Sequence, residues 1–271
     1  MIDKMQAHFG FTQMPFGRDL APAMLHRHAA HDEAAARITW AITEKALGVL
    51  TGEVGVGKTV AVRAALAALD PTRHTVIYIG NPATGVRGIH HHIVTALGGR
   101  PAHGTATLTA QAYDVLAGEA AERGRVPILI IDEAHLLDHA QLESIRMLTN
   151  HDMDSRTPFA CLLIGQPTLR RMIKLGVLAA LDQRIAVRYQ MTGMTPGETG
   201  SYIRHHLALA GRDGDLYSDD AITQIHDASR GKPRAINNLA IAALVATYAT
   251  GKKIVDQSAA RAAISEVVST E

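Results

Sequence analysis

The residues of this sequence best suited to chemistry form a glycine-rich loop that ends in a lysine and a threonine. Residues 51–59 read TGEVGVGKT and contain the spacing G-x-x-x-x-G-K-[ST]. Glycines at these positions let backbone N–H groups approach a polyphosphate, while Lys58 can hold the β- and γ-phosphates and the Thr59 hydroxyl can bind Mg²⁺. The residues expected to contact the nucleotide are Gly52, Glu53, Val54, Gly55, Val56, Gly57, Lys58, Thr59 and Val60. The loop therefore predicts a site for ATP or GTP with Mg²⁺.

A pair of adjacent carboxylates forms the second candidate centre. The apolar residues 128–131 read ILII and predict a buried strand, and Asp132 and Glu133 follow it directly. Ligands of open parallel sheets bind at the carboxyl ends of the strands. Asp132 can hold Mg²⁺ there through water, and Glu133 can polarise the water that attacks the γ-phosphate. Together with the glycine loop, this pair predicts nucleotide hydrolysis.

A third polar side chain follows the next expected strand. Residues 159–164 read FACLLI, and Gly165 and Gln166 come directly after them. A polar group at this strand tip, beside the carboxylate strand, is well placed to sense the γ-phosphate and to align the attacking water. We therefore predict that Gln166 takes part in hydrolysis.

Two groups of histidines do not predict a metal site. No cysteine and no nearby carboxylate pair completes a ligand set around His26, His28 and His31. The three adjacent histidines at 90–92 lie in an expected helix, so they point in three directions and cannot form the i, i+4 pair that binds zinc. We interpret the histidines at 90–92 as solvated or phosphate-facing side chains.

Alternating strands and helices are expected to position these residues. Strands are expected near 46–50, 74–80, 128–131, 159–164 and 186–191. Helices are expected near 30–45, 60–69, 86–97, 107–123, 168–175 and 177–185. Strands separated by helices require a parallel sheet with right-handed crossovers. After about residue 191 only helical patterns follow, with Thr195 and Glu198 spaced as a capping box, so a small all-helical domain is expected.

Composition narrows the class of protein. Hydrophobic content of 47% and charged content of 20% are those of an ordinary soluble globule. The net charge of +1 means that any nucleic-acid contact must come from a local patch or from many copies together. Cys161 is the only cysteine, which excludes disulfides and fits a reducing compartment. No apolar stretch is long enough to span a bilayer and no signal pattern is present, so we expect a cytoplasmic protein without membrane contact.

The motifs together resemble those of AAA+ ATPases. The resemblance includes the glycine loop, IIDEAH at 130–135, LLIGQP at 162–167, LDQRI at 181–185 and GKPR at 231–234. With FGF at 9–11 and PF at 15–16, the chain is similar over nearly its whole length to the branch that contains ExeA and GspA.

The AAA+ resemblance implies the architecture. It predicts a five-stranded parallel sheet in the order 5-1-4-3-2, followed by a small helical lid. Three regions are expected: an irregular N-terminal strap near the adenine pocket at 1–30, the α/β ATPase domain at 31–192, and the lid at 193–271. For the N-terminal region, packing over the core is the alternative to packing at the adenine pocket.

The resemblance also implies roles for two arginines. Arg184 matches the arginine finger that reaches the γ-phosphate held by a neighbouring copy, and Arg188 is the alternative finger. Arg234 matches the lid arginine termed sensor 2, which couples the phosphate state to the lid. A surface salt bridge is the alternative for each arginine, and many AAA+ proteins have Asn or Thr where this chain has Gln166. A finger that acts on another copy predicts a ring or a helical filament.

The branch contains secretion-accessory ATPases and ATPases encoded beside transposases, related in role to TnsC and MuB. The length of the chain favours the second class. In that class, ATP-bound copies assemble on duplex DNA, recruit or activate a transposase, and leave on hydrolysis. A target-selection protein is a further candidate partner. Candidate DNA contacts are Arg87, Arg100 and Lys174, with solvated surface charges as the alternative. Two other functions remain open: a secretion-type ATPase that acts on protein, and a nucleotide-gated scaffold with little turnover.

Overall fold

The structure is a computed structural model that describes residues 2–17, 20–150 and 157–268, so each of the three expected regions includes a few residues outside this description. The chain divides into two compact units. The sheet unit contains Asp32–Val54 and Lys58–Met191. The helical unit contains Met1–His31, Gly55–Gly57 and Thr192–Glu271.

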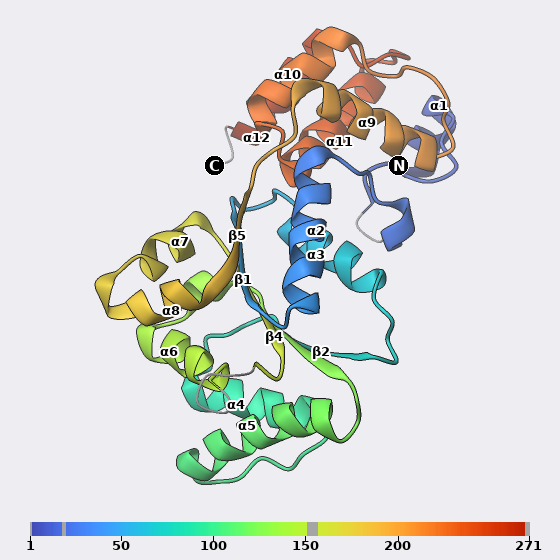
Figure 1. Ribbon diagram of the computed structural model, residues 1–271. Helices are drawn as coiled ribbons and strands as arrows, with labels where there is room; N and C mark the ends of the chain where they lie inside the picture. The colour runs from blue at the N-terminus through green and yellow to red at the C-terminus, as the bar shows by residue number, and fades with distance from the viewer. Residues whose placement is uncertain (1, 18–19, 151–156, 269–271) are drawn as a thin grey trace. The chain divides into compact units, whose positions relative to one another are not determined.

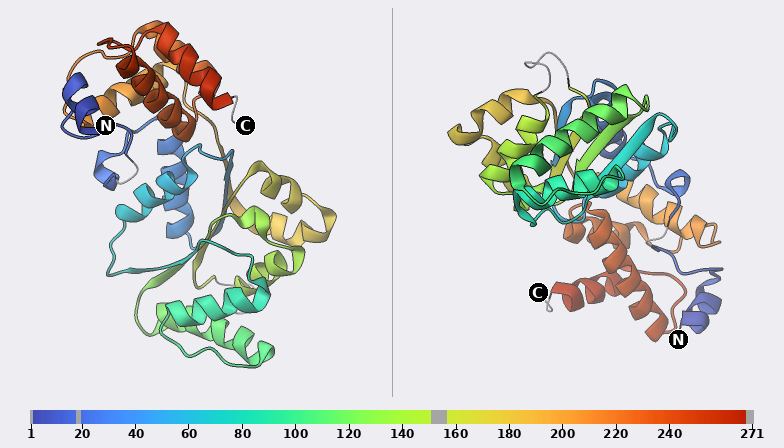
Figure 2. Two further views of the ribbon diagram at one scale, coloured as in Figure 1. Left: turned by 180° about the vertical axis from the view of Figure 1, so that it is seen from behind. Right: turned by 90° about the horizontal axis from the view of Figure 1, so that it is seen from below.

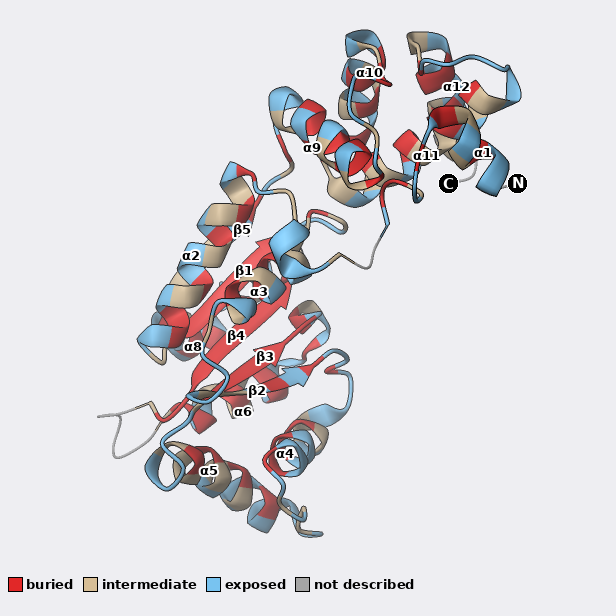
Figure 3. Ribbon diagram, turned by 90° about the vertical axis from the view of Figure 1, so that its right-hand side faces the viewer, coloured by how far each residue is buried: buried red, intermediate tan, exposed pale blue. Residues whose placement is uncertain are grey.

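Five parallel strands form the centre of the sheet unit (Figure 1). They are β1 (Leu47–Gly52), β2 (His74–Ile79), β3 (Val126–Ile131), β4 (Ala160–Gly165) and β5 (Ile185–Met191). Their order is β2-β3-β4-β1-β5, which confirms the predicted parallel sheet with the order 5-1-4-3-2. The central strands β3, β4 and β1 are almost entirely buried, and Figure 3 shows them in red. Their nearly continuous apolar sequences follow from this burial on both faces.

Helices cover both faces of the sheet. They are α2 (Ala29–Thr43), α3 (Lys58–Ala67), α4 (Gly85–Ala96), α5 (Thr105–Ala121), α6 (His139–Leu148), α7 (Pro167–Ile173) and α8 (Ala179–Arg184). On one face Leu129 and Leu163 share a core with Ile93 of α4, Leu142 of α6 and Leu169 of α7. Helices α4 and α5 pack side by side over this face (Figure 2). Helix α6 is not among the helices expected from the sequence.

The opposite face is covered by α2 and α3. A Cβ atom at Gly48 of β1 would lie 3.0 Å from Leu162 of β4 and 3.4 Å from Ala41 of α2. Glycine at this position therefore lets α2 approach the strand closely. The edge strand β2 lies beyond this cover, so Val76 and Tyr78 keep nearly half of their surface exposed.

The helical unit confirms the predicted change of class after residue 191. It contains α9 (Pro196–Leu209), α10 (Asp219–Ser229), α11 (Pro233–Ala249), α12 (Gln257–Val268) and, from the N-terminal segment, α1 (Ile2–Phe9). The predicted capping box begins α9, since the Glu198 N–H donates to the Thr195 hydroxyl and the Glu198 carboxylate accepts from the Thr195 N–H. Beyond Met191 the described residues hold no strand, only one bridge between Tyr217 and Val255.

The N-terminal segment is more regular than expected, because residues 2–9 form a helix. Met5 and Phe9 lie one turn apart and are both buried in the core of the helical unit. Phe11 and Phe16 belong to the same core, together with Tyr217. The aromatic side chains of this segment therefore stabilise the helical unit. None of the helices in the described parts of the chain combines the length and hydropathy that a membrane span needs.

Candidate active site

The glycine loop lies between β1 and α3, as the sequence predicts. Strand β1 ends at Gly52 and α3 begins at Lys58. Gly55 and Gly57 have φ angles of 80° and 100°, a backbone region that side chains other than glycine rarely adopt. The Lys58 ammonium donates to the carbonyl oxygens of Gly52 (2.8 Å) and Glu53 (3.0 Å). The lysine therefore lies over its own loop, where a polyphosphate would bind.

Arg234 contacts the tip of this loop within the helical unit. Its backbone N–H donates to the Gly55 carbonyl at 3.3 Å, one residue after α11 begins at Pro233. A Cβ atom at Gly55 would lie 2.9 Å from the Arg234 Cβ, so only glycine permits this approach.

Asp132 is the most constrained carboxylate of the site. It follows β3 and is only 6% exposed. Its Oδ1 accepts the Glu133 N–H at 2.9 Å, and its Oδ2 accepts the hydroxyls of Thr59 and Tyr78, both at 3.0 Å. The structure therefore brings Thr59 and Asp132 together, as predicted. Burial and the nearby Asp132 charge raise the pKa of Tyr78 to about 12, so Tyr78 remains a proton donor at neutral pH.

The oxygen atoms of Thr59 and Asp132 fit a magnesium ion. Mg²⁺ prefers oxygen ligands and is usually held by one or two carboxylates, water and substrate phosphates rather than by a complete protein cage. Thr59 and Asp132 are therefore the residues that would hold Mg²⁺ against a bound nucleotide.

Glu133 occupies a sharp turn at the end of β3. Its φ of 51° and ψ of 34° are left-handed, which is uncommon for a residue other than glycine. Its side chain is half exposed, and its Oε2 lies 3.3 Å from Nδ1 of His135. Glu133 thus has a solvent-accessible carboxylate directly after the buried Asp132, an arrangement suited to contact with water.

Gln166 follows β4, the neighbour of β3, and precedes α7. A Cβ atom at Gly165 would lie 3.1 Å from the backbone nitrogen of His135, so the segments after these two strands are in close contact. Gln166 therefore lies at the same carboxyl end of the strands as Asp132 and Glu133, as predicted.

Arg184 lies at the opposite end of the sheet, where the strands begin. It ends α8, and the next residue, Ile185, pairs with Leu47 at the start of β1. The glycine loop follows the other end of this six-residue strand, about 20 Å away at the usual rise of a strand. The Arg184 guanidinium donates to the Thr149 carbonyl at 3.3 Å. Arg184 therefore lies too far from the glycine loop of its own chain to reach a phosphate bound there.

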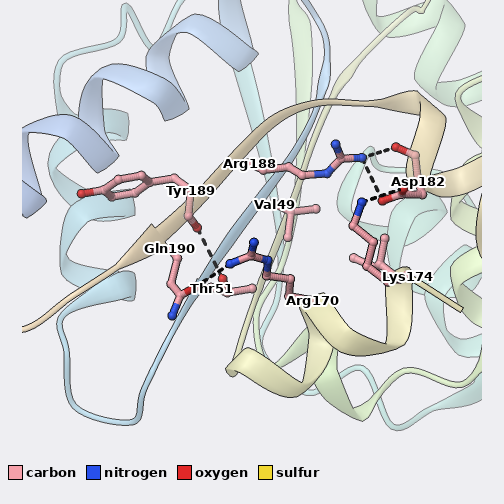
Figure 4. A pocket seen from close by; sticks show the side chains of 9 residues that line it. Val49, Thr51, Arg170, Lys174, Asp182, Arg188, Tyr189 and Gln190 are labelled. Atoms are coloured by element: carbon pink, nitrogen blue, oxygen red, sulfur yellow. Dashed lines mark hydrogen bonds and ion pairs between the residues drawn. The ribbon is translucent and has the colours of Figure 1, made fainter.

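The alternative finger, Arg188, is held beside a small cavity on β5 (Figure 4). Its guanidinium donates to the carboxylate of Asp182 at 2.9 Å and to the Asp182 backbone carbonyl. Lys174 pairs with the same carboxylate at 3.0 Å, and Arg170 donates to the Gln190 amide oxygen at 2.7 Å. The cavity has a volume of about 210 Å³. Its lining residues are Val49, Thr51, Arg170, Ile173, Lys174, Asp182, Arg188, Tyr189 and Gln190.

The three candidate DNA contacts are not brought together. Arg87 lies in the first turn of α4 and donates to the His103 carbonyl, and Arg100 lies in the loop after α4. Lys174 follows α7, which Figure 1 shows apart from α4. The candidates therefore belong to two separate surfaces of the sheet unit.

The interpretation of the histidines at 90–92 is wrong for His90. Its ring is 1% exposed, and its two nitrogens bond to the hydroxyls of Thr109 (3.1 Å) and Ser144 (2.9 Å). Burial lowers the pKa of His90 below its usual value. His91 and His92 are exposed, in agreement with the prediction.

Comparisons with known proteins agree with this geometry. Residues 42–173 match the AAA domain family. A curated relative, General secretion pathway protein A of Aeromonas hydrophila, is 33% identical over 246 residues, which cover 90% of this chain and 45% of the relative. The chain thus spans less than half the length of that relative.

Three solved structures share the fold at 15–16% sequence identity. Cdc6p from Pyrobaculum aerophilum has a TM-score of 0.68 and is matched over 89% of this chain and 67% of its own. The ORC1 protein of Aeropyrum pernix in complex with DNA has a TM-score of 0.62, with coverages of 93% and 68%. The RuvB Holliday junction branch migration motor of Thermotoga maritima has a TM-score of 0.58, with coverages of 86% and 68%. Residues 42–173 are thus similar to an AAA domain, and the fold of the chain is that of the three solved structures.

Proposed function

We propose that this chain hydrolyses ATP in sites completed by a second copy, and that it assembles on duplex DNA as an accessory ATPase of a transposase. The position of Arg184 supports the proposal that a second copy completes each site. Arg184 lies where the strands of the sheet begin, whereas the glycine loop lies where β1 ends. A chain that needs this arginine near the γ-phosphate must receive it from a neighbour. Assembly and hydrolysis are then coupled, because each contact between copies completes one site.

The positions of the site residues support one role for each. Lys58 and the backbone N–H groups of the glycine loop bind the phosphates. Thr59 and Asp132 would hold Mg²⁺, which would supply positive charge to neutralise the phosphates. The half-exposed carboxylate of Glu133 orients and polarises the attacking water, and Gln166 at the end of the neighbouring strand assists it. Arg184 of the second copy stabilises charge on the transferring phosphoryl group.

Two observations support the DNA part of the proposal. Three cations, Arg170, Lys174 and Arg188, surround one cavity that contains a single carboxylate, Asp182. Such a local positive surface is repeated in every copy of an assembly, so many weak phosphate contacts add along the duplex. A protein with the same fold, ORC1 of Aeropyrum pernix, is known in complex with DNA.

A secretion-type assembly ATPase is the second candidate. It is supported by the 33% identity to General secretion pathway protein A over 90% of this chain. A protein of this class would act on other proteins, so duplex DNA would change neither its turnover nor its assembly.

Measurement of ATP turnover and particle size, with and without duplex DNA, separates these functions. Rings or filaments on DNA with stimulated hydrolysis are the expected result. Absence of both responses, with normal turnover, would contradict the DNA proposal and favour the secretion-type function. Stable ATP-bound assemblies that hardly hydrolyse ATP with Glu133 intact would indicate a nucleotide-gated scaffold instead.

A further inference from the structure

Tyr78 is a polar contact of the active site that the sequence motifs do not include. It lies near the carboxyl end of the edge strand β2 and is 47% exposed. Its hydroxyl nevertheless donates to Oδ2 of Asp132 at 3.0 Å. Tyr78 pairs with Ile130 across the parallel β2 and β3 strands, so its side chain leaves the same face of the sheet as Asp132, two residues further along.

The hydrogen bonds of Asp132 show what this contact does. Oδ1 accepts the N–H of Glu133, which fixes one side of the carboxylate. Oδ2 accepts two hydroxyls, one from Thr59 on α3 and one from Tyr78 on β2. Three donors from three different segments therefore define the plane of a carboxylate that is only 6% exposed. Without Tyr78, Thr59 would be the only hydroxyl donor to Oδ2 among the hydrogen bonds described.

The segment after β2 accommodates the tyrosine ring. A Cβ atom at Gly80 would lie 3.1 Å from Cε1 and 3.5 Å from the hydroxyl oxygen of Tyr78. The φ angle of Gly80 is not positive, so its backbone conformation does not itself require glycine. The absence of a side chain at position 80 leaves the ring room to reach Asp132.

We propose that Tyr78 is a positioning residue for Mg²⁺ in this ATPase. It holds the Asp132 carboxylate in the orientation that the metal and its water ligands need, and it does not itself touch nucleotide. The inference rests on the proposed role of Asp132. Groups that orient metal ligands typically change metal affinity by about 10- to 100-fold when removed.

The test is the Mg²⁺ dependence of nucleotide affinity in Tyr78→Phe, measured by the fluorescence anisotropy of a labelled ATP analogue. This variant keeps the ring and removes only the hydroxyl. We expect an unchanged affinity in EDTA and an increase of about tenfold in the Mg²⁺ concentration needed for half of the Mg²⁺-dependent gain. Tyr113→Phe on α5 (Thr105–Ala121) is the matched control, because it removes a hydroxyl from a helix on the opposite face of the sheet unit.

Gly80→Ala provides an independent variant, since its new methyl group would displace the Tyr78 ring by a few tenths of an ångström. It should shift the Mg²⁺ curve in the same direction, and the double variant with Tyr78→Phe should be no worse than Tyr78→Phe alone. Additive effects in the double variant would contradict a shared mechanism.

Asp132→Asn separates failure of this inference from failure of the proposed function. If Asp132→Asn shifts the Mg²⁺ curve and Tyr78→Phe does not, Tyr78 has no positioning role. If neither variant shifts the curve, the assignment of Asp132 to the metal site is itself wrong. A loss of nucleotide affinity for Tyr78→Phe in EDTA would indicate a general structural role and would also overturn the inference.

Discussion

Lys58 and Arg184 lie at opposite ends of the strands of one sheet. Lys58 follows the carboxyl end of β1, whereas Arg184 precedes Ile185, which pairs with the first residue of β1. One chain therefore cannot bring both cations to the same triphosphate. If both act in hydrolysis, the active unit is a pair of neighbouring copies.

Arg184→Ala should lower the turnover of assembled protein by at least about a thousandfold, as for other arginine fingers, while ATP binding persists. Steady-state ATP turnover and nucleotide anisotropy measure the two effects. Arg188→Ala is the matched control, since Arg188 is an arginine on the adjoining strand β5 that pairs with Asp182 of α8. A larger loss for Arg188→Ala than for Arg184→Ala would reverse the assignment of the finger.

Mixing two inactive variants tests the shared site directly. A copy with Arg184→Ala keeps Glu133, and a copy with Glu133→Gln keeps Arg184. Mixed assemblies should recover turnover, because some sites then combine an intact carboxylate with an arginine from the neighbour. Turnover that equals the sum of the separate variants would show that both residues act within one chain.

Glu133→Gln should abolish hydrolysis while preserving ATP binding and assembly. The amide cannot polarise water as the carboxylate does, but it keeps the size of a side chain that is half exposed and not part of the core. Size-exclusion chromatography with ATP should show assemblies that persist, whereas those of the unchanged protein decay as ATP is consumed. Normal turnover of Glu133→Gln would exclude Glu133 as the water-polarising group.

Local patterns predicted most of the fold and the centre of the site. The glycine loop is one continuous segment directly after β1, and the two carboxylates are adjacent residues directly after β3. The position of each motif at a strand end therefore depends on local structure. Helix α6 is not among the expected helices, although Leu142, Ile145 and Leu148, which are all buried, form a helical pattern. Its capping box of Asp138 and Gln141 is a second signal.

Contacts between distant segments could not be predicted in the same way. The burial of His90 depends on hydroxyls from α5 and α6, which lie 19 and 54 residues away. The bond between Tyr78 and Asp132 likewise joins residues 54 apart and depends on the pairing of β2 with β3. A tyrosine near the carboxyl end of the edge strand β2 is the local signal for it.

The surfaces proposed to bind DNA can be distinguished by salt dependence. Each lost phosphate contact should reduce the slope of log affinity against log salt concentration by about one unit. We expect this reduction for Lys174→Gln beside the cavity. Arg87→Gln and Arg100→Gln test the other surface. Asp182→Asn should strengthen DNA binding, because it removes the carboxylate that pairs with Lys174 and Arg188. If all four variants have the same slope as the unchanged protein, a DNA contact at either surface is contradicted.

The helical unit should lose stability in mild acid because of a buried histidine. Burial, with smaller effects from the charges of His205 and His26, lowers the pKa of His206 to about 4. The unfolded chain binds a proton near the ordinary value of about 6.5, whereas the folded chain binds it only near 4. Stability is therefore full above about pH 6.5 and falls as the pH decreases toward 4.

The measurement is the free energy of unfolding of His206→Gln and of the unchanged protein between pH 7 and pH 4. His206→Gln should show a shallower decline, because the titrating group is gone, although the loss of its stacking on Phe16 lowers its stability at neutral pH. His92→Gln is the control for the replacement of a histidine as such, since His92 is exposed. His26, whose pKa is also lowered to about 4 and whose ring lies 5.4 Å from that of His205, accounts for part of the decline that remains in His206→Gln. Identical profiles for His206→Gln and the unchanged protein would show that burial of His206 does not set the acid sensitivity.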